Sequence, residues 1–170
     1  NLAKFYEEMG FKQLRQALNL SGEEAAPVAI DYAEVEQVTP DMLTEDSFFH
    51  FEIFGDNYHT EPIIGFAWGT KGQLYASTDT GLLQTPIFKE FLEKTPLKVY
   101  DFKRAKVLLS HLGITLQNPA FDSRLAKYLL STVEDNEIST IASLYSQIAL
   151  PLDEVVYGKG AKKAIPEKAV

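Results

Sequence analysis

The stretch "SFFHFEIFGDNYHTEPIIGFAWG", Ser47–Gly69, predicts two neighbouring strands of a central sheet. Residues 46–54 are a dense run of aromatic and aliphatic side chains, which favours a buried strand over a helix. After the turn-forming letters "GDNY", residues 62–69 form a second apolar run. Because alternate side chains of a strand share one face, we expect His50 and Glu52 to lie side by side. This pair is the first candidate functional feature.

Outward from this stretch, the apolar spacing predicts further strands and then helices. The expected strands are an edge strand at 28–35, 46–54, 62–69, 73–78 after the tight turn "TKG", and 97–101. The expected helices are 86–95, 102–112, 123–131 and 139–149. Asp101 and Asp122 are each expected to cap the helix that follows, since aspartate is strongly preferred at helix N-termini. This order of elements predicts an α/β sandwich.

The composition bounds the function. A chain of 170 residues with 45% hydrophobic content suits one domain with a real core. The absence of cysteine excludes disulfides, thiolate zinc sites and cysteine nucleophiles. The net charge of −8 opposes a domain that grips a phosphate backbone alone. No apolar run is long enough for a membrane span, and the opening residues do not resemble a signal peptide. Because the sequence opens on asparagine, we expect a piece cut from a longer chain.

Four segments carry a family resemblance: "NYHTEPIIGFAWG", "VYDFKRAKVLLSHLGI", "FDSRLAKYLLS" and "DEVVYGKGAKKAIPE". In order and spacing they resemble the 3′–5′ exonuclease-like domain of bacterial family A DNA polymerases. The resemblance implies a ribonuclease H-like (DnaQ-like exonuclease) fold over residues 28–170, truncated at its C-terminal part, with a mixed central sheet of about five strands flanked by helices. Residues 1–18 resemble the helix after the 5′-nuclease domain, so 1–27 is expected to be a helical arm and linker.

The resemblance also implies where a catalytic centre would lie. Active members of the family use two divalent metals, which need a cluster of anionic oxygen ligands to offset the repulsion between the ions. The family motifs fall on His50 and Glu52 in the first strand and on Ala105 in the central helix. The third motif is not found in place, because Tyr157 is followed four residues later by Ala161. Only Glu52 is a carboxylate, so we expect a vestigial site with no bound metal and no exonuclease activity.

Two alternatives stay open at this point. One is a weak Mn²⁺-dependent 3′–5′ exonuclease that uses Glu52 and His50 with Asp101 as a substitute ligand, although the helix-capping role of Asp101 is favoured. The other is a non-catalytic module that holds single-stranded DNA or a protein partner. Its DNA contacts would come from three lysines of the basic loop at 157–166, namely Lys159, Lys162 and Lys163. A solvated loop is the commoner explanation of such a cluster.

Other short patterns are interpreted as structural. Tyr75 to Asp79 matches the letters of the third motif, and Asp135 to Glu137 matches the first, but neither has the required context.

The resemblance, with its missing carboxylates, implies a structural spacer between the polymerase and 5′-nuclease domains of a cytoplasmic DNA replication and repair polymerase. That parent uses Mg²⁺ and carries the DNA contacts. The fragment itself is expected to need no cofactor, to bind DNA weakly and to have no membrane partner.

Overall fold

The computed structural model describes residues 30–132, 135–146 and 148–166. The arm expected at 1–27 lies outside these residues. The strands are β1 (Ala33–Glu34), β2 (Phe48–Ile53), β3 (Ile63–Thr70), β4 (Gln73–Ser77), β5 (Lys98–Val99) and β6 (Phe121–Asp122). The α-helices are α3 (Pro86–Lys94), α4 (Phe102–His111), α5 (Ser123–Leu130), α6 (Ile138–Ser146) and α7 (Asp153–Val156). Short 3₁₀ helices are η1 (Pro40–Met42), η2 (Thr80–Gln84) and η3 (Gly160–Lys162).

The described strands form one mixed sheet in the order β1-β4-β3-β2-β5-β6. The β2–β3 and β3–β4 pairs are antiparallel, whereas β1–β4, β2–β5 and β5–β6 are parallel. The expected α/β architecture with a mixed sheet is confirmed, with six strands rather than about five. The additional strand, β6, has two residues. So short a strand carries no periodic signal of its own and is defined only by its pairing with β5.

Successive side chains of β2 point to opposite faces of the sheet, as the alternation in the sequence predicted. One face is the core face, and the other, which carries His50 and Glu52, is called the site face. Phe49, Phe51 and Ile53 are buried in the core, while His50 and Glu52 point to the other face and are half-buried. The core is mostly aromatic around Trp68, whose indole N–H donates to the carbonyl oxygen of Met42 at 2.9 Å. Every buried hydrophobic residue of the core cluster lies between positions 49 and 116.

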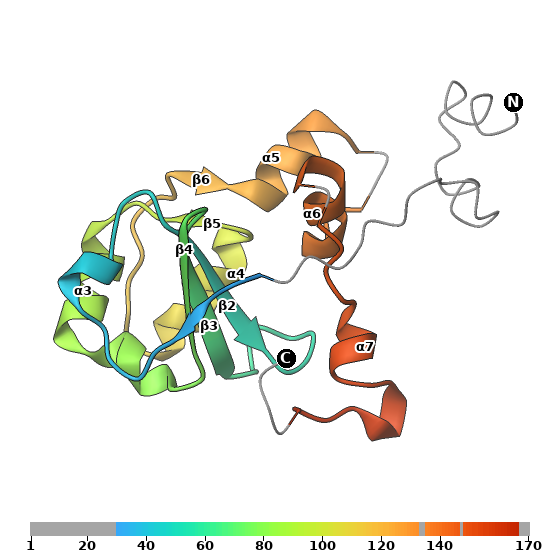
Figure 1. Cartoon of the computed structure of the whole chain (residues 1–170), viewed down its shortest axis with the longest axis horizontal. Helices are drawn as coiled ribbons and strands as arrows, with labels where there is room; N and C mark the ends of the chain where they lie inside the picture. The colour runs from blue at the N-terminus through green and yellow to red at the C-terminus, as the bar shows by residue number, and fades with distance from the viewer. Residues whose placement is uncertain (1–29, 133–134, 147, 167–170) are drawn as a thin grey trace, which may run out of the picture.

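The helices divide into two groups around the sheet. Figure 1 shows α3 on one side of the sheet and α6 and α7 on the opposite side, with α5 above them. Because the buried core stops at position 116, the helices α5, α6 and α7 add no residue to it.

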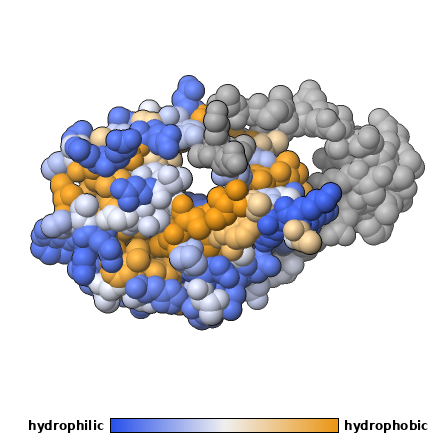
Figure 2. Space-filling model, turned by 90° about the horizontal axis from the view of Figure 1, so that it is seen from below, coloured by the Kyte–Doolittle hydropathy of each residue, from blue (hydrophilic) through white to orange (hydrophobic). Residues whose placement is uncertain are grey.

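Figure 2 shows hydrophobic residues that remain at the surface on the face seen from below. Within the described residues, no helix has the length and apolar content needed to cross a lipid bilayer.

Candidate functional site

The strand β2 and the helix α4 meet at one small cavity. Its lining is Phe49, His50, Phe51, Val99, Tyr100, Asp101, Arg104 and Ala105. The structure thus places His50 and Ala105, from separate segments, on the same cavity. Glu52 adjoins it through His50, whose Nε2 lies 2.8 Å from Glu52 Oε2. The cavity has a volume of about 10 Å³, which is room for roughly one water molecule.

Both carboxylate oxygens of Glu52 have side-chain partners. Oε2 contacts His50, and Oε1 accepts a hydrogen bond from the Tyr157 hydroxyl at 3.2 Å. Burial of Glu52 acts to raise its pKa, but the hydrogen bond and charge of His50, the charge of Arg104 and the Tyr157 hydroxyl outweigh burial and hold the pKa below its ordinary value. Glu52 is therefore ionised, and both of its carboxylate oxygens already contact side chains of the same chain.

Tyr157 is held in place to donate to Glu52. Burial, together with the negative charge of Glu52, raises the pKa of Tyr157 to about 12, so the hydroxyl keeps its proton at neutral pH. The ring of Tyr157 lies edge-on to Phe54 at the end of β2, with 5.6 Å between the ring centroids. Lys163 Nζ lies 5.5 Å from the centroid of the same Phe54 ring. These contacts fasten the 157–163 loop over the end of β2.

Arg104 adds a positive charge where a metal site would need negative ones. It lies on α4 directly before Ala105 and lines the cavity. Its Nε atom is buried and has no hydrogen-bond partner in the described part of the chain. Sequence reasoning missed Arg104 and considered Tyr157 only as the start of an incomplete motif. Because Arg104 directly precedes Ala105, the sequence could have indicated that Arg104 lies near the cavity. No local pattern indicated that Tyr157 would contact Glu52.

The donor set does not fit the two divalent metals that the family resemblance implies for active members. Two hard cations need several carboxylate oxygens free to coordinate them. Here Glu52 is bonded to His50 and Tyr157, and Arg104 would repel a second cation. Over residues 30–132, 135–146 and 148–166, no group of three or more histidine, aspartate or glutamate side chains lies close enough to hold a metal ion.

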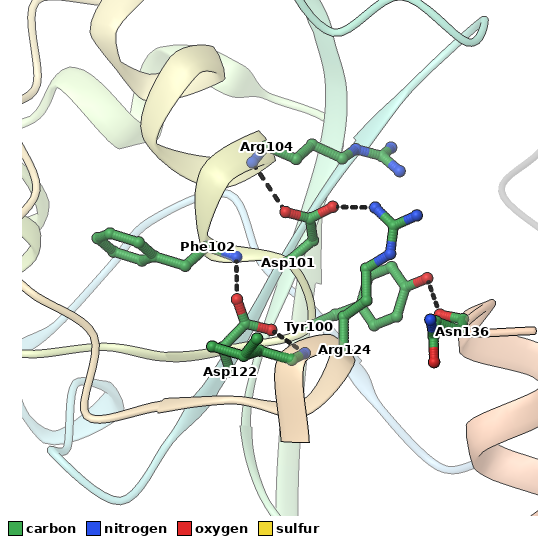
Figure 3. A network of polar contacts seen from close by, with 8 residues as sticks. Tyr100, Asp101, Phe102, Arg104, Asp122, Arg124 and Asn136 are labelled. Atoms are coloured by element: carbon green, nitrogen blue, oxygen red, sulfur yellow. Dashed lines mark hydrogen bonds and ion pairs between the residues drawn. The ribbon is translucent and has the colours of Figure 1, made fainter. Parts of the chain in front are cut away.

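Asp101, the possible substitute ligand, is engaged in helix capping and an ion pair. Its Oδ1 accepts the backbone N–H of Arg104 at 3.0 Å, and its Oδ2 pairs with the Arg124 guanidinium of α5 (Figure 3). The predicted N-cap role of Asp101 is confirmed. The neighbouring Asp122 caps α5, also as predicted, and its Oδ2 accepts the N–H of Phe102 at 2.9 Å. The two aspartates thus join the starts of α4 and α5.

Replacing Asp101 with alanine is expected to lower the free energy of unfolding by about 1–2 kcal/mol, the usual effect of losing an N-cap. Asp101→Asn keeps a capping oxygen but not the charge that pairs with Arg124, so it should retain most of the stability. Urea unfolding followed by circular dichroism measures both variants. Equal losses for alanine and asparagine would mean that the ion pair, and not the cap, carries the effect.

The remaining candidates lie apart from this site. His59 is in the turn after β2, where its backbone N–H donates to the Asn57 side chain. His111 ends α4 and lines a different cavity, of about 200 Å³. Tyr75 is a buried core residue. Glu137 donates its backbone N–H to Asp135 in the loop before α6, so the two short patterns have structural roles.

The basic loop is partly neutralised within the chain. Lys159 pairs with Glu154, and Lys163 lies over the Phe54 ring. Lys162 is exposed in η3. A role of these three lysines in DNA binding stays a prediction, since two of them already have intramolecular partners.

Comparison with known proteins identifies the family. Residues 49–170 match the family model of the DNA polymerase I ribonuclease H-like domain. The chain belongs to this family. DNA polymerase I of Streptococcus pneumoniae (strain ATCC BAA-255 / R6) is 64% identical over 168 residues, covering 99% of this chain and 19% of that protein. DNA polymerase I of Lactococcus lactis subsp. lactis (strain IL1403) is 44% identical over 175 residues, covering 99% of this chain and 19% of that protein.

More distant similarities agree on the fold of this DNA polymerase I domain. DNA polymerase I of Bacillus subtilis (strain 168) is 35% identical over 175 residues, covering 97% of this chain and 20% of that protein. The solved structure of Brucella melitensis NrnC with bound Mg²⁺ aligns with a TM-score of 0.55 at 12% identity, over 69% of this chain and 61% of that chain. The ribonuclease H-like fold of a 3′–5′ exonuclease-like domain is confirmed. The chain spans about a fifth of the length of its polymerase relatives.

Proposed function

We propose that this chain is a non-catalytic exonuclease-like domain that acts as a structural spacer in a bacterial DNA polymerase I. It separates the polymerase and 5′-nuclease domains of one polypeptide and packs against the polymerase domain. The parent enzyme serves DNA replication and repair in the cytoplasm, and its Mg²⁺ belongs to the polymerase reaction elsewhere in the chain. The domain needs no cofactor of its own.

The observation that carries this proposal is the state of Glu52. Its two oxygens are taken by His50 and Tyr157. Arg104 and Ala105 of α4 line the neighbouring cavity. Hydrolysis by two metals needs open carboxylate ligands and room for both ions and the scissile phosphate. A cavity with room for only about one water molecule, beside a single carboxylate whose two oxygens already have partners, supports a scaffold and opposes an exonuclease.

A 3′-end digestion assay tests the proposal. The 170-residue chain and the full-length polypeptide that carries it are each incubated with single-stranded DNA, first with Mg²⁺ and then with Mn²⁺. The matched control is Glu52→Ala in both proteins, and an active 3′–5′ exonuclease calibrates the assay. We expect no release of nucleotides above the Glu52→Ala background with either metal, because the ligand set cannot assemble a two-metal centre.

Two results would count against the spacer. Trimming that needs Mn²⁺ and disappears in Glu52→Ala would establish the weak exonuclease instead. Salt-sensitive binding of single-stranded DNA that is lost when Lys159, Lys162 and Lys163 are replaced by alanine would favour the binding module. The net charge of −8 opposes the second result.

A further inference from the structure

The segment that includes α7 lies outside the hydrophobic core. The buried core of the described chain stops at position 116, and in Figure 1 α7 and the residues that follow it stand out from the sheet. The large apolar side chains of this segment are between 52% and 75% exposed: Leu152, Val155 and Ile165. Burial of apolar surface therefore does little to hold the segment in place, because that stabilisation scales with the apolar area removed from water.

Residues 157–164 form a closed loop, which is named the strap. The backbone N–H of Ala164 donates to the carbonyl oxygen of Tyr157 at 2.8 Å and joins the two ends of the loop. Gly158 has a φ of +81°, and a Cβ atom at this position would lie 3.0 Å from the carbonyl oxygen of Lys162, so the turn requires glycine. The strap thus has a defined shape of its own, and its position depends on what it contacts.

Contacts of two strap residues place the strap on the end of β2. The Tyr157 hydroxyl donates to Glu52, and the Tyr157 ring lies edge-on to Phe54. Lys163 lies over the same Phe54 ring. Tyr157 and Lys163 are half-buried, whereas residues 159–162 between them are exposed. The hydrogen bond to Glu52 has an ionised acceptor, and such bonds are roughly twice as strong as bonds between neutral groups.

We propose that Glu52 is the anchor of the strap and positions residues 157–164 against the sheet through the Tyr157 hydroxyl. His50 completes the arrangement, because its Nε2 lies 2.8 Å from the other carboxylate oxygen of Glu52 and orients the group. Glu52 then has a task that requires no catalysis and that goes beyond the proposed spacer function. The carboxylate on the site face is kept as a positioning residue for the polypeptide that follows α7.

The alternative is a strap that the aromatic contact alone holds in place. The Phe54 ring would then fix the ring at position 157, and phenylalanine would serve there as well as tyrosine. The hydrogen bond between Tyr157 and Glu52 is partly buried. A buried hydroxyl without a partner costs free energy, so the bond to Glu52 satisfies a group that the aromatic contact leaves unpaired. The two accounts therefore differ in what they predict for a variant that lacks only the hydroxyl.

Hydrogen–deuterium exchange tests the anchor in the full-length polypeptide that carries this chain. Mass spectrometry follows the peptide that contains the strap and, as a report on the core, a peptide from α3. Glu52→Ala removes both carboxylate oxygens, Glu52→Gln keeps a carbonyl oxygen as acceptor, and Tyr157→Phe removes only the hydroxyl. The matched control is Glu154→Ala, which breaks the ion pair with Lys159 but removes no contact with β2.

We expect Glu52→Ala and Tyr157→Phe each to raise the exchange rate of the strap peptide about fivefold, with no change in the α3 peptide. The double variant Glu52→Ala/Tyr157→Phe should exchange no faster than either single variant, because both substitutions remove the same bond. Glu52→Gln and Glu154→Ala should each stay within about twofold of the parent protein.

Unchanged exchange of the strap in Tyr157→Phe would overturn the proposal, since the ring would then hold the strap without the hydroxyl. Effects that multiply in the double variant would also overturn it, because the two residues would act independently. An equal rise in the α3 peptide would do the same, because Glu52 would then support the whole domain. Exchange reports the position of the strap and the 3′-end assay reports chemistry, so failure of the anchor and failure of the non-catalytic assignment are distinguishable.

Discussion

Trp68→Ala is expected to lower the free energy of unfolding by about 4 kcal/mol, near the upper end for a single core substitution. Trp68 is 1% exposed and lies at the centre of the aromatic core. Its ring centroid is 5.4 Å from that of Phe66, 5.3 Å from that of Tyr75 and 5.1 Å from that of Phe88. Alanine would leave a large cavity and would also remove the N–H donor to the Met42 carbonyl oxygen.

Urea unfolding followed by far-ultraviolet circular dichroism measures this loss. Tryptophan fluorescence is not usable, because the chain has one tryptophan and the variant removes it. Leu129→Ala is the control: this side chain is also large and apolar, but it is 76% exposed, so its replacement should change stability by no more than about 0.5 kcal/mol. A loss below about 2 kcal/mol for Trp68→Ala would mean that the aromatic core repacks around the missing ring.

Gly69→Ala is expected to destabilise the domain by roughly 3 kcal/mol through the backbone of the β3–β4 hairpin. Gly69 has a φ of +145°, a conformation that residues with a side chain rarely adopt. A Cβ atom at this position would lie 2.2 Å from the carbonyl oxygen of Gln73 and 2.9 Å from Cα of Leu74. Both contacts are with the backbone of the paired strand β4, so relief requires the strands to separate.

The control for Gly69 is in the same hairpin. Gly72 lies in the turn between β3 and β4, and a Cβ atom there would meet no atom within 4 Å. Gly72→Ala should therefore leave stability within about 0.5 kcal/mol of the parent chain. The measurement is the urea midpoint of each variant. Equal midpoints for the two alanine variants would show that the hairpin relaxes without cost and that Gly69 is not required by its geometry.

These two substitutions act on the same central strands that carry the site. The strand β2, with His50 and Glu52 on one face, pairs with β3 along most of its length. The core packed on the other face of β2 includes Trp68 of β3. The proposed spacer function would depend on this central packing, and chemistry at Glu52 is expected to be dispensable for it.

Much of the fold follows from local patterns in the sequence. The aromatic alternation in β2 predicts which residues are buried, because successive side chains of a strand point to opposite faces. The capping roles of Asp101 and Asp122 follow from the strong preference for aspartate at helix N-termini. The same period of two predicts that His50 and Glu52 share a face, and the two side chains are hydrogen-bonded.

The contacts that complete the site depend on tertiary structure. Tyr157 is 105 residues from Glu52 in the sequence, and no local spacing brings them together. Arg104 and Ala105 reach the cavity because α4 packs against β2, which brings two segments that are distant in the sequence together. The two-residue strand β6 exists through its pairing with β5 alone.

Helix α5 shows both what local sequence patterns determine and what depends on tertiary contacts. Its sequence determines an amphipathic helix that begins after Asp122, because side-chain spacing and capping are local properties. Which side of that helix turns inward is not a local property: Arg124 pairs with Asp101 at the start of α4, and Lys127 is the residue that is buried. The sequence alone determined the longer strands and helices, the capping aspartates and which side chains are apolar. Only the tertiary structure decided which apolar surface stays uncovered, because covering a surface requires residues that are distant along the chain.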